Sequence, residues 1–208
     1  HGLGTIAASV IEKIPGMEIF GIVNDELEIG DSQGKFTPIP VIGKFNDIPK
    51  LLKDDDTFLI VTYRDMKNEK KDWENFARLR IPREKLINII HPTCIIPEKF
   101  CRIGNGIFMA PYVQLSTETI IRDNCVLYGN SFIGHDATID EFVSIANHTS
   151  IGAHVHIQRG AHIGSNSTIR ERVTIGEFSL VGMGSVVVKD VPSNSIVAGV
   201  PARVIGTK

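Results

Sequence analysis

Residues 133–169 read IGHDATIDEFVSIANHTSIGAHVHIQRGAHIGSNSTI, and every sixth residue of this stretch is isoleucine. The same six-residue spacing continues in both directions, with an apolar residue at each step. Neither the 3.6-residue period of a helix nor the two-residue period of a strand explains this spacing. The repeated apolar positions are Ile103, Met109, Leu115, Ile121, Leu127, Ile133, Ile139, Ile145, Ile151, Ile157, Ile163, Ile169, Ile175, Val181 and Val187.

A second class of residue, small or β-branched, follows four positions after each of these steps, as at Ala137 and Val155. Short strands joined by sharp turns fit this pattern, because three strands close one triangular coil of three hexads. The large aliphatic residue then points inward, and glycines such as Gly134 allow close approach of neighbouring backbones. Coils stack at about 4.8 Å, so five coils give a prism of roughly 24 Å. The repeat therefore predicts a left-handed parallel β-helix over residues 91–208, including a C-terminal cap.

Residues 1–90 show a different pattern, in which expected strands and helices alternate. This alternation predicts a small Rossmann-like α/β domain with a parallel sheet, whose ligand would sit beyond the carboxyl ends of the strands. Gly2 and Gly4 stand at the start of an expected helix, whose N-terminus is a potential phosphate site. Asn24-Asp25 stand at the end of an expected strand, where they either hold a nucleotide or form a simple turn. We expect helices over 5–14, 48–52 and 66–79, and strands over 17–23, 57–62 and 86–90.

Composition excludes several classes of partner. The net charge of −2 predicts no nucleic-acid partner, and the lack of a long apolar run predicts no membrane insertion. The N-terminus, His1-Gly2-Leu3-Gly4, lacks the features of a signal peptide. The cysteines, Cys94, Cys101 and Cys125, are odd in number and irregularly spaced, so we interpret them as reduced packing residues of a cytoplasmic protein.

Four segments resemble the bacterial hexapeptide acetyltransferases that carry a small N-terminal α/β domain. This branch includes the nucleotide-linked 4-amino-sugar N-acetyltransferases and the sialic acid O-acetyltransferase NeuD family. His1-Gly2 looks like the end of the branch's glycine-rich loop, Gly-x-x-Gly-His-Gly, whose first strand would lie upstream of His1. The segments are His1-Gly2, PIPVIG (38–43), IGHD (133–136) and VAGVPAR (197–203).

The resemblance implies an activity and an assembly. The expected function is acetyl-CoA-dependent N-acetylation of the amino group of a nucleotide-linked 4-amino-deoxysugar, for surface glycan biosynthesis. The branch forms homotrimers, with acetyl-CoA between neighbouring β-helices and the nucleotide sugar held by the α/β domain, here residues 1–90. No metal is expected.

His135 is the predicted catalytic base, since no other histidine of the repeat is directly followed by a carboxylate, that of Asp136. Acyl transfer needs a group that removes a proton during attack, and histidine does so near neutral pH. A carboxylate on the other ring nitrogen would fix the tautomer and raise the basicity. In the resembling enzymes a histidine followed by an acid stands at this place.

Further site residues follow from the resemblance. The backbone N–H of Ala153, one coil after His135, would bind the oxyanion. Gly2, Asn24 and Asp25 would bind the nucleotide sugar. The positions expected to bind acetyl-CoA are Ala153, Ser165, Met183, Lys189 and Arg203.

Three other functions remain open. The first is O-acetylation of a sialic acid or another sugar hydroxyl, which would use a similar base and cleft. The second is a γ-type carbonic anhydrase, which needs three histidines around zinc. The spacing of His148 from His154, and of His156 from His162, places the members of each pair on different faces of the prism. The third is a non-catalytic β-helix that serves as a scaffold.

Overall fold

The hexads form a parallel β-helix with three flat faces. The computed structural model describes residues 3–62 and 68–208. Each two-residue strand pairs in parallel with the strand one coil away, as Ile133 with Ile151. Face I consists of β4 (Ile89–Ile90), β6 (Phe108–Met109), β9 (Val126–Leu127), β12 (Ser144–Ile145), β15 (His162–Ile163), β18 (Leu180–Val181), β20 (Ser195–Gly199) and β21 (Ala202–Thr207).

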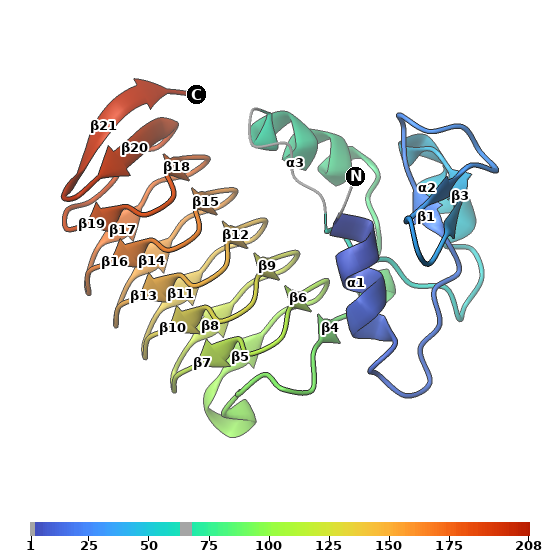
Figure 1. The fold of residues 1–208 in the computed structure, drawn as a ribbon, viewed down its shortest axis with the longest axis horizontal. Coiled ribbons are helices and arrows are strands. Elements are labelled where there is room, and N and C mark those ends of the chain that lie inside the picture. Colours follow the sequence, from blue (N-terminus) through green and yellow to red (C-terminus); the bar gives the residue numbers. More distant parts are fainter. Residues whose placement is uncertain (1–2, 63–67) are drawn as a thin grey trace.

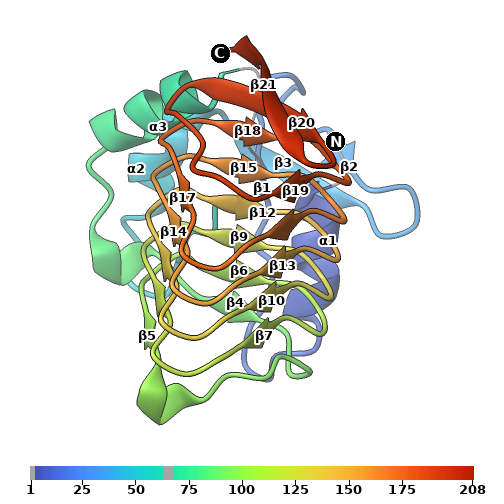
Figure 2. The ribbon, with the colours of Figure 1, turned by 90° about the vertical axis from the view of Figure 1, so that its left-hand side faces the viewer.

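The chain runs from face I to face II, then to face III and back to face I, so every coil has three corners (Figure 2). The five-stranded sheets of faces II and III match the five coils expected from the repeat. Face II consists of β7 (Gln114–Leu115), β10 (Phe132–Ile133), β13 (Ser150–Ile151), β16 (Thr168–Ile169) and β19 (Val186–Val187). Face III consists of β5 (Arg102–Ile103), β8 (Ile120–Ile121), β11 (Thr138–Ile139), β14 (His156–Ile157) and β17 (Thr174–Ile175).

The repeated aliphatic residues fill the inside of the prism. Ile133, Ile145 and Ile151 are completely buried, which confirms the predicted inward position. At each corner one residue adopts a positive φ, such as 58° at Asp136, and this conformation turns the chain sharply. The next residue is small or β-branched and buried. Where it carries a hydroxyl, the hydroxyl donates to a backbone carbonyl, either three residues earlier, as at Thr149, or in the next coil, as from Ser167 to Gly182. The polar corner atoms are thereby satisfied inside an apolar core.

The open C-terminal end of the prism is capped as the sequence predicts. Strand β20 continues face I by pairing in parallel with β18, and β21 folds back antiparallel on β20. The cysteines also confirm their expected packing role, since Cys101 and Cys125 belong to the core and Cys94 packs against it, all with free thiols. Burial raises the pKa of the Cys94 thiol. Across the described ranges, no helix has the length and apolarity that a membrane crossing requires.

The N-terminal segment departs from the expected parallel sheet. The sheet that its described residues form is mixed, because Gly34, with φ of 112°, lets the chain turn back so that β2 (Ser32–Gln33) pairs antiparallel with β3 (Ile39–Gly43). Between 57 and 62 only a single bridge forms, from Leu59 to Leu86, and the strand expected over 86–90 joins the prism instead. The elements before the prism are α1 (Leu3–Ile11), β1 (Ile22–Val23), β2 (Ser32–Gln33), β3 (Ile39–Gly43), α2 (Ile48–Leu51) and α3 (Glu69–Arg78), with 3-10 turns at Phe45–Asp47 and Arg83–Lys85. The strand expected over 17–23 is thus reduced to β1, and residues 66–67 of the helix expected over 66–79 lie outside the described residues.

Two helices attach this segment to face I and to its corner with face III (Figure 1). Helix α1 packs Val10 against Phe108 and Val126 on the outside of the face. Helix α3 contacts the corner between faces III and I, where the rings of Phe76 and Phe142 lie 5.1 Å apart. The N-terminal segment therefore covers face I, and the corner between faces II and III is the vertex that points away from it.

His162 makes the covered face sensitive to acid. Burial, together with the nearby charge of Lys208, lowers the pKa of His162 to about 4 from an ordinary value of 6.5. Its Nδ1 is buried and has no hydrogen-bond partner in the described part of the chain. Below pH 6.5 the imidazole of His162 is therefore protonated in the unfolded chain but stays neutral in the folded chain. The free energy of unfolding falls as the pH is lowered from 6.5 to about 4, by about 3 kcal/mol in total.

Denaturant unfolding from pH 7.5 to 4 measures this contribution. The carboxylates of the protein titrate in the same range, so the informative quantity is the difference between the native chain and His162→Gln. We expect the stability of the native chain to fall more steeply below pH 6.5 than that of the variant. Parallel curves for the two proteins would show that His162 is not buried in its neutral form.

Candidate functional site

His135 and Asp136 lie together at the corner between faces II and III. His135 Nδ1 is 2.6 Å from Asp136 Oδ2, and both side chains are about half exposed. The pair comes from adjacent positions of one tight turn, directly after β10. The hydrogen bond to His135 lowers the pKa of Asp136, and the nearby His154 and Arg172 act in the same direction. Asp136 is therefore a carboxylate at neutral pH and can hold the proton of one histidine nitrogen, which leaves the other nitrogen free to act as a base.

The eighteen-residue coil brings further side chains to this corner. His154 occupies the position of Asp136 one coil later, and its ring centroid lies 5.2 Å from that of His135 in an edge-to-face arrangement. Its backbone N–H donates to the carbonyl oxygen of His135 at 2.9 Å. Sequence analysis did not assign a role to His154, although the eighteen-residue spacing from Asp136 was a signal that could have found it.

Ala153 stands one coil above His135 at the same corner, as the sequence predicts. Its carbonyl accepts a hydrogen bond from the N–H of Arg172, while its own N–H makes no hydrogen bond to the described residues. Gly134 lies directly beneath it, and a Cβ at Gly134 would come within 2.7 Å of the Ala153 nitrogen. Glycine at 134 thus keeps the two coils close and this N–H uncovered.

The positions predicted to bind acetyl-CoA are divided between two corners in one chain. Lys189 lies on the corner of His135 and Ala153, three coils above His135, and is exposed. Ser165 and Met183 stack one coil apart at the corner between faces I and II, and Met183 is 81% exposed. Arg203 is exposed on β21, where its guanidinium donates to the carbonyl of Ala202. Within one chain, Ser165 and Met183 therefore lie on a different corner from His135.

The predicted nucleotide-binding residues of the N-terminal segment are engaged in a loop. Asn24 follows β1, and its side-chain oxygen accepts the N–H groups of Glu26 and Leu27. Asp25 accepts the N–H of Phe45 at 2.7 Å. These hydrogen bonds fit the interpretation of Asn24-Asp25 as a turn. Binding of the nucleotide sugar by these two residues stays a prediction. Gly2 lies outside the described residues.

The remaining repeat histidines are distributed as the spacing indicates. His148 lies on the corner between faces I and II, whereas His156 lies on face III and His162 on face I. His156 Nε2 is 2.8 Å from Asp140, whose other carboxylate oxygen pairs with Arg122 at 3.0 Å. Sequence analysis missed this Arg122–Asp140–His156 cluster, which links neighbouring coils on the outside of face III.

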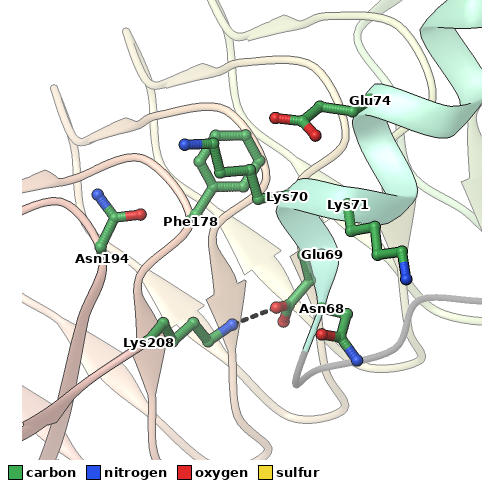
Figure 3. Close-up of a pocket in the computed structure, with 8 residues that line it drawn as sticks. All are labelled: Asn68, Glu69, Lys70, Lys71, Glu74, Phe178, Asn194 and Lys208. Atoms are coloured by element: carbon green, nitrogen blue, oxygen red, sulfur yellow. Dashed lines mark hydrogen bonds and ion pairs between the residues drawn. The ribbon is translucent and has the colours of Figure 1, made fainter.

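A cavity of about 370 Å³ lies elsewhere, between α3 and the C-terminal end of the prism (Figure 3). The ion pair between Lys208 and Glu69 borders it and ties β21 to the first turn of α3. None of the predicted site residues lines this cavity. The lining residues are Asn68, Glu69, Lys70, Lys71, Glu74, Phe178, Asn194 and Lys208.

Several solved structures share the fold. A perosamine N-acetyltransferase mutant from Caulobacter crescentus, in complex with CoA and GDP-perosamine, has a TM-score of 0.84 at 22% identity, over 99% of this chain and 93% of that one. The acetyltransferase domain of PglB from Neisseria gonorrhoeae FA1090, with acetyl coenzyme A, has a TM-score of 0.81 at 23% identity, over 98% and 95%. WeeI from Acinetobacter baumannii AYE has a TM-score of 0.76 at 22% identity, over 97% and 94%.

At these identities the likeness establishes the fold. The stacked parallel sheets fit the left-handed β-helix of these acetyltransferase structures. No protein-family model matches the chain, and no curated protein is significantly similar to it in sequence.

Proposed function

We propose that this protein is an acetyl-CoA-dependent N-acetyltransferase that modifies the amino group of a nucleotide-linked 4-amino-deoxysugar for surface glycan biosynthesis. The observation that carries the proposal is the 2.6 Å contact between His135 and Asp136 at an exposed corner. The shared fold supports it, because the similar structures include complexes with CoA, acetyl coenzyme A and GDP-perosamine. The reduced cysteines fit a cytoplasmic enzyme.

In the proposed reaction His135 acts as the general base. Asp136 holds the proton on Nδ1 of His135, which leaves the lone pair on Nε2. Nε2 accepts a proton from the sugar amine while the amine nitrogen attacks the carbonyl carbon of the thioester. The N–H of Ala153, one coil above, donates to the oxyanion that forms. Collapse of the tetrahedral intermediate breaks the C–S bond, and the CoA sulfur receives the proton from His135. An amide and free CoA result.

A neighbouring copy of the chain would complete the site. The N-terminal segment covers face I, whereas His135 lies at the opposite vertex of the prism. A nucleotide sugar held by the N-terminal segment of one chain would therefore reach the His135 of another chain. The same arrangement would join the corner of Ser165 and Met183 to the corner of Ala153 and Lys189, with acetyl-CoA between them. We infer a homotrimer on these grounds.

The test is release of free CoA thiol from acetyl-CoA in the presence of UDP-, dTDP- and GDP-linked 4-amino sugars and their 4-hydroxy counterparts. Thiol release that depends on an amino sugar, with a product heavier by one acetyl group, would support the proposal and identify the nucleotide. Acetylation of hydroxyl acceptors only would establish the alternative, a sugar or sialic acid O-acetyltransferase. Intact protein that neither binds acetyl-CoA nor turns over any acceptor would favour a scaffold.

A further inference from the structure

We propose that the corner of His135 also binds one divalent transition-metal ion, with Zn²⁺ as the best-matched ion, through His135, Asp136 and His154. The inference that bound metal switches the acetyltransferase off rests on the proposed function, whereas the inference that metal binds does not. These three residues form the one group of potential metal ligands found among residues 3–62 and 68–208.

The distances suit a metal ion. One potential ligand atom from each of the three residues lies within 4.8 Å of the others. Nitrogen and oxygen ligands bind zinc at about 2.0–2.2 Å, which places neighbouring ligands roughly 3–3.5 Å apart. All three side chains are exposed, so small side-chain rotations close the remaining distance without moving the core.

The backbone of the coils fixes the points from which the ligands project. Asp136 and His154 occupy the same position in successive coils, with φ of 58° and 57°. The hydrogen bond from the His154 N–H to the His135 carbonyl ties the second histidine to the first. A rigid framework of this kind lowers the entropy cost of gathering three ligands around an ion.

The ligand set indicates which ion binds. Two imidazoles and one carboxylate favour zinc, copper, nickel or cobalt over magnesium or calcium, which prefer oxygen ligands. Arg172, one coil above His154, acts on Asp136 and opposes a cation, whereas Glu118 occupies the same corner position one coil below Asp136 and would favour one. The exposed corner leaves the remaining coordination positions to water.

A bound metal would prevent His135 from acting as a general base, whichever of its two ring nitrogens binds the ion. At Nε2 the metal occupies the lone pair that would accept the substrate proton. At Nδ1 the metal takes the place of the proton held by Asp136, and the neutral ring carries that proton on Nε2 instead, as an N–H group with no lone pair to accept a proton.

Titration of the full-length chain with Co²⁺, followed by visible d–d absorption, tests the site directly. We expect one Co²⁺ per chain, displaced by Zn²⁺, and at least a tenfold weaker affinity in His154→Ala. The matched control is His148→Ala, because His148 is also an exposed corner residue with φ of 57° and should not affect binding. No Co²⁺ absorption in the native chain, equal affinity in His154→Ala, or equal loss in His148→Ala would overturn the site.

A second measurement tests the switch. Zn²⁺ should inhibit thiol release by the native enzyme, a chelator should restore it, and His154→Ala should require at least tenfold more Zn²⁺ for half inhibition. Equal sensitivity of the two enzymes would overturn the switch. Failure of this inference differs from failure of the proposed function, since Co²⁺ absorption is measured without acetyl-CoA or sugar and can be present in a protein that has no transferase activity.

Discussion

Replacement of His135 by alanine is expected to lower acetyl-transfer turnover by about 10²- to 10⁴-fold, the usual contribution of a general base. The side chain is exposed and packs only at a surface corner, so the coil should keep its structure. The measurement is steady-state thiol release with the best acceptor of the panel. The loss should fall on kcat, because His135 acts on the proton that moves during attack rather than on binding of acetyl-CoA.

The control for this prediction is another histidine of the repeat. His156→Ala removes an imidazole from the outside of face III, away from both corners of the proposed site, and should keep turnover within a few-fold of the native value. Asp136→Asn keeps the shape of the side chain but removes the charge that orients His135, and should also lower turnover. Near-normal turnover in His135→Ala would exclude His135 as the base.

Replacement of Ile121 by alanine is expected to destabilise the protein by about 2–5 kcal/mol. Ile121 is 1% exposed and lies in the core of the prism, where loss of its side chain leaves a cavity between stacked coils. The measurement is the free energy of unfolding from chemical denaturation at one fixed protein concentration, because any association of chains adds to the apparent stability.

The neighbouring residue of the same strand provides the control. Ile120 is 39% exposed and points out of face III, so Ile120→Ala should cost much less, within about 1 kcal/mol. The two substitutions remove the same atoms from adjacent residues, and only the direction of the side chain differs. A cost at Ile120 equal to that at Ile121 would contradict the assignment of the inward frame.

The repeat allowed the prism to be predicted in detail because each coil obeys the same local rule. Ile133, Ile145 and Ile151 point inward for one reason, which is that a two-residue strand has one inner and one outer side chain. The N-terminal segment has no such repetition. Its strands are short, and the antiparallel position of β2 depends on the single turn at Gly34. Part of the strand expected over 86–90 belongs to the prism, because Ile89 and Ile90 pair in parallel with β6. This pairing depends on residues far along the chain, so the sequence of 86–90 alone does not reveal it.

By itself, the sequence determined the stacked coils, their inward residues and the outward corner shared by His135 and Asp136, since these follow from a six-residue period and from adjacency in the chain. Only the tertiary structure decided what surrounds that corner. Stacking at one strand spacing brings His154 beside Asp136 and places Arg172 one coil further on. Helix α1 settles on face I, and α3 on the corner between faces III and I, because the apolar and aromatic side chains there need covering. That placement leaves the corner of His135 on the far vertex, open to solvent.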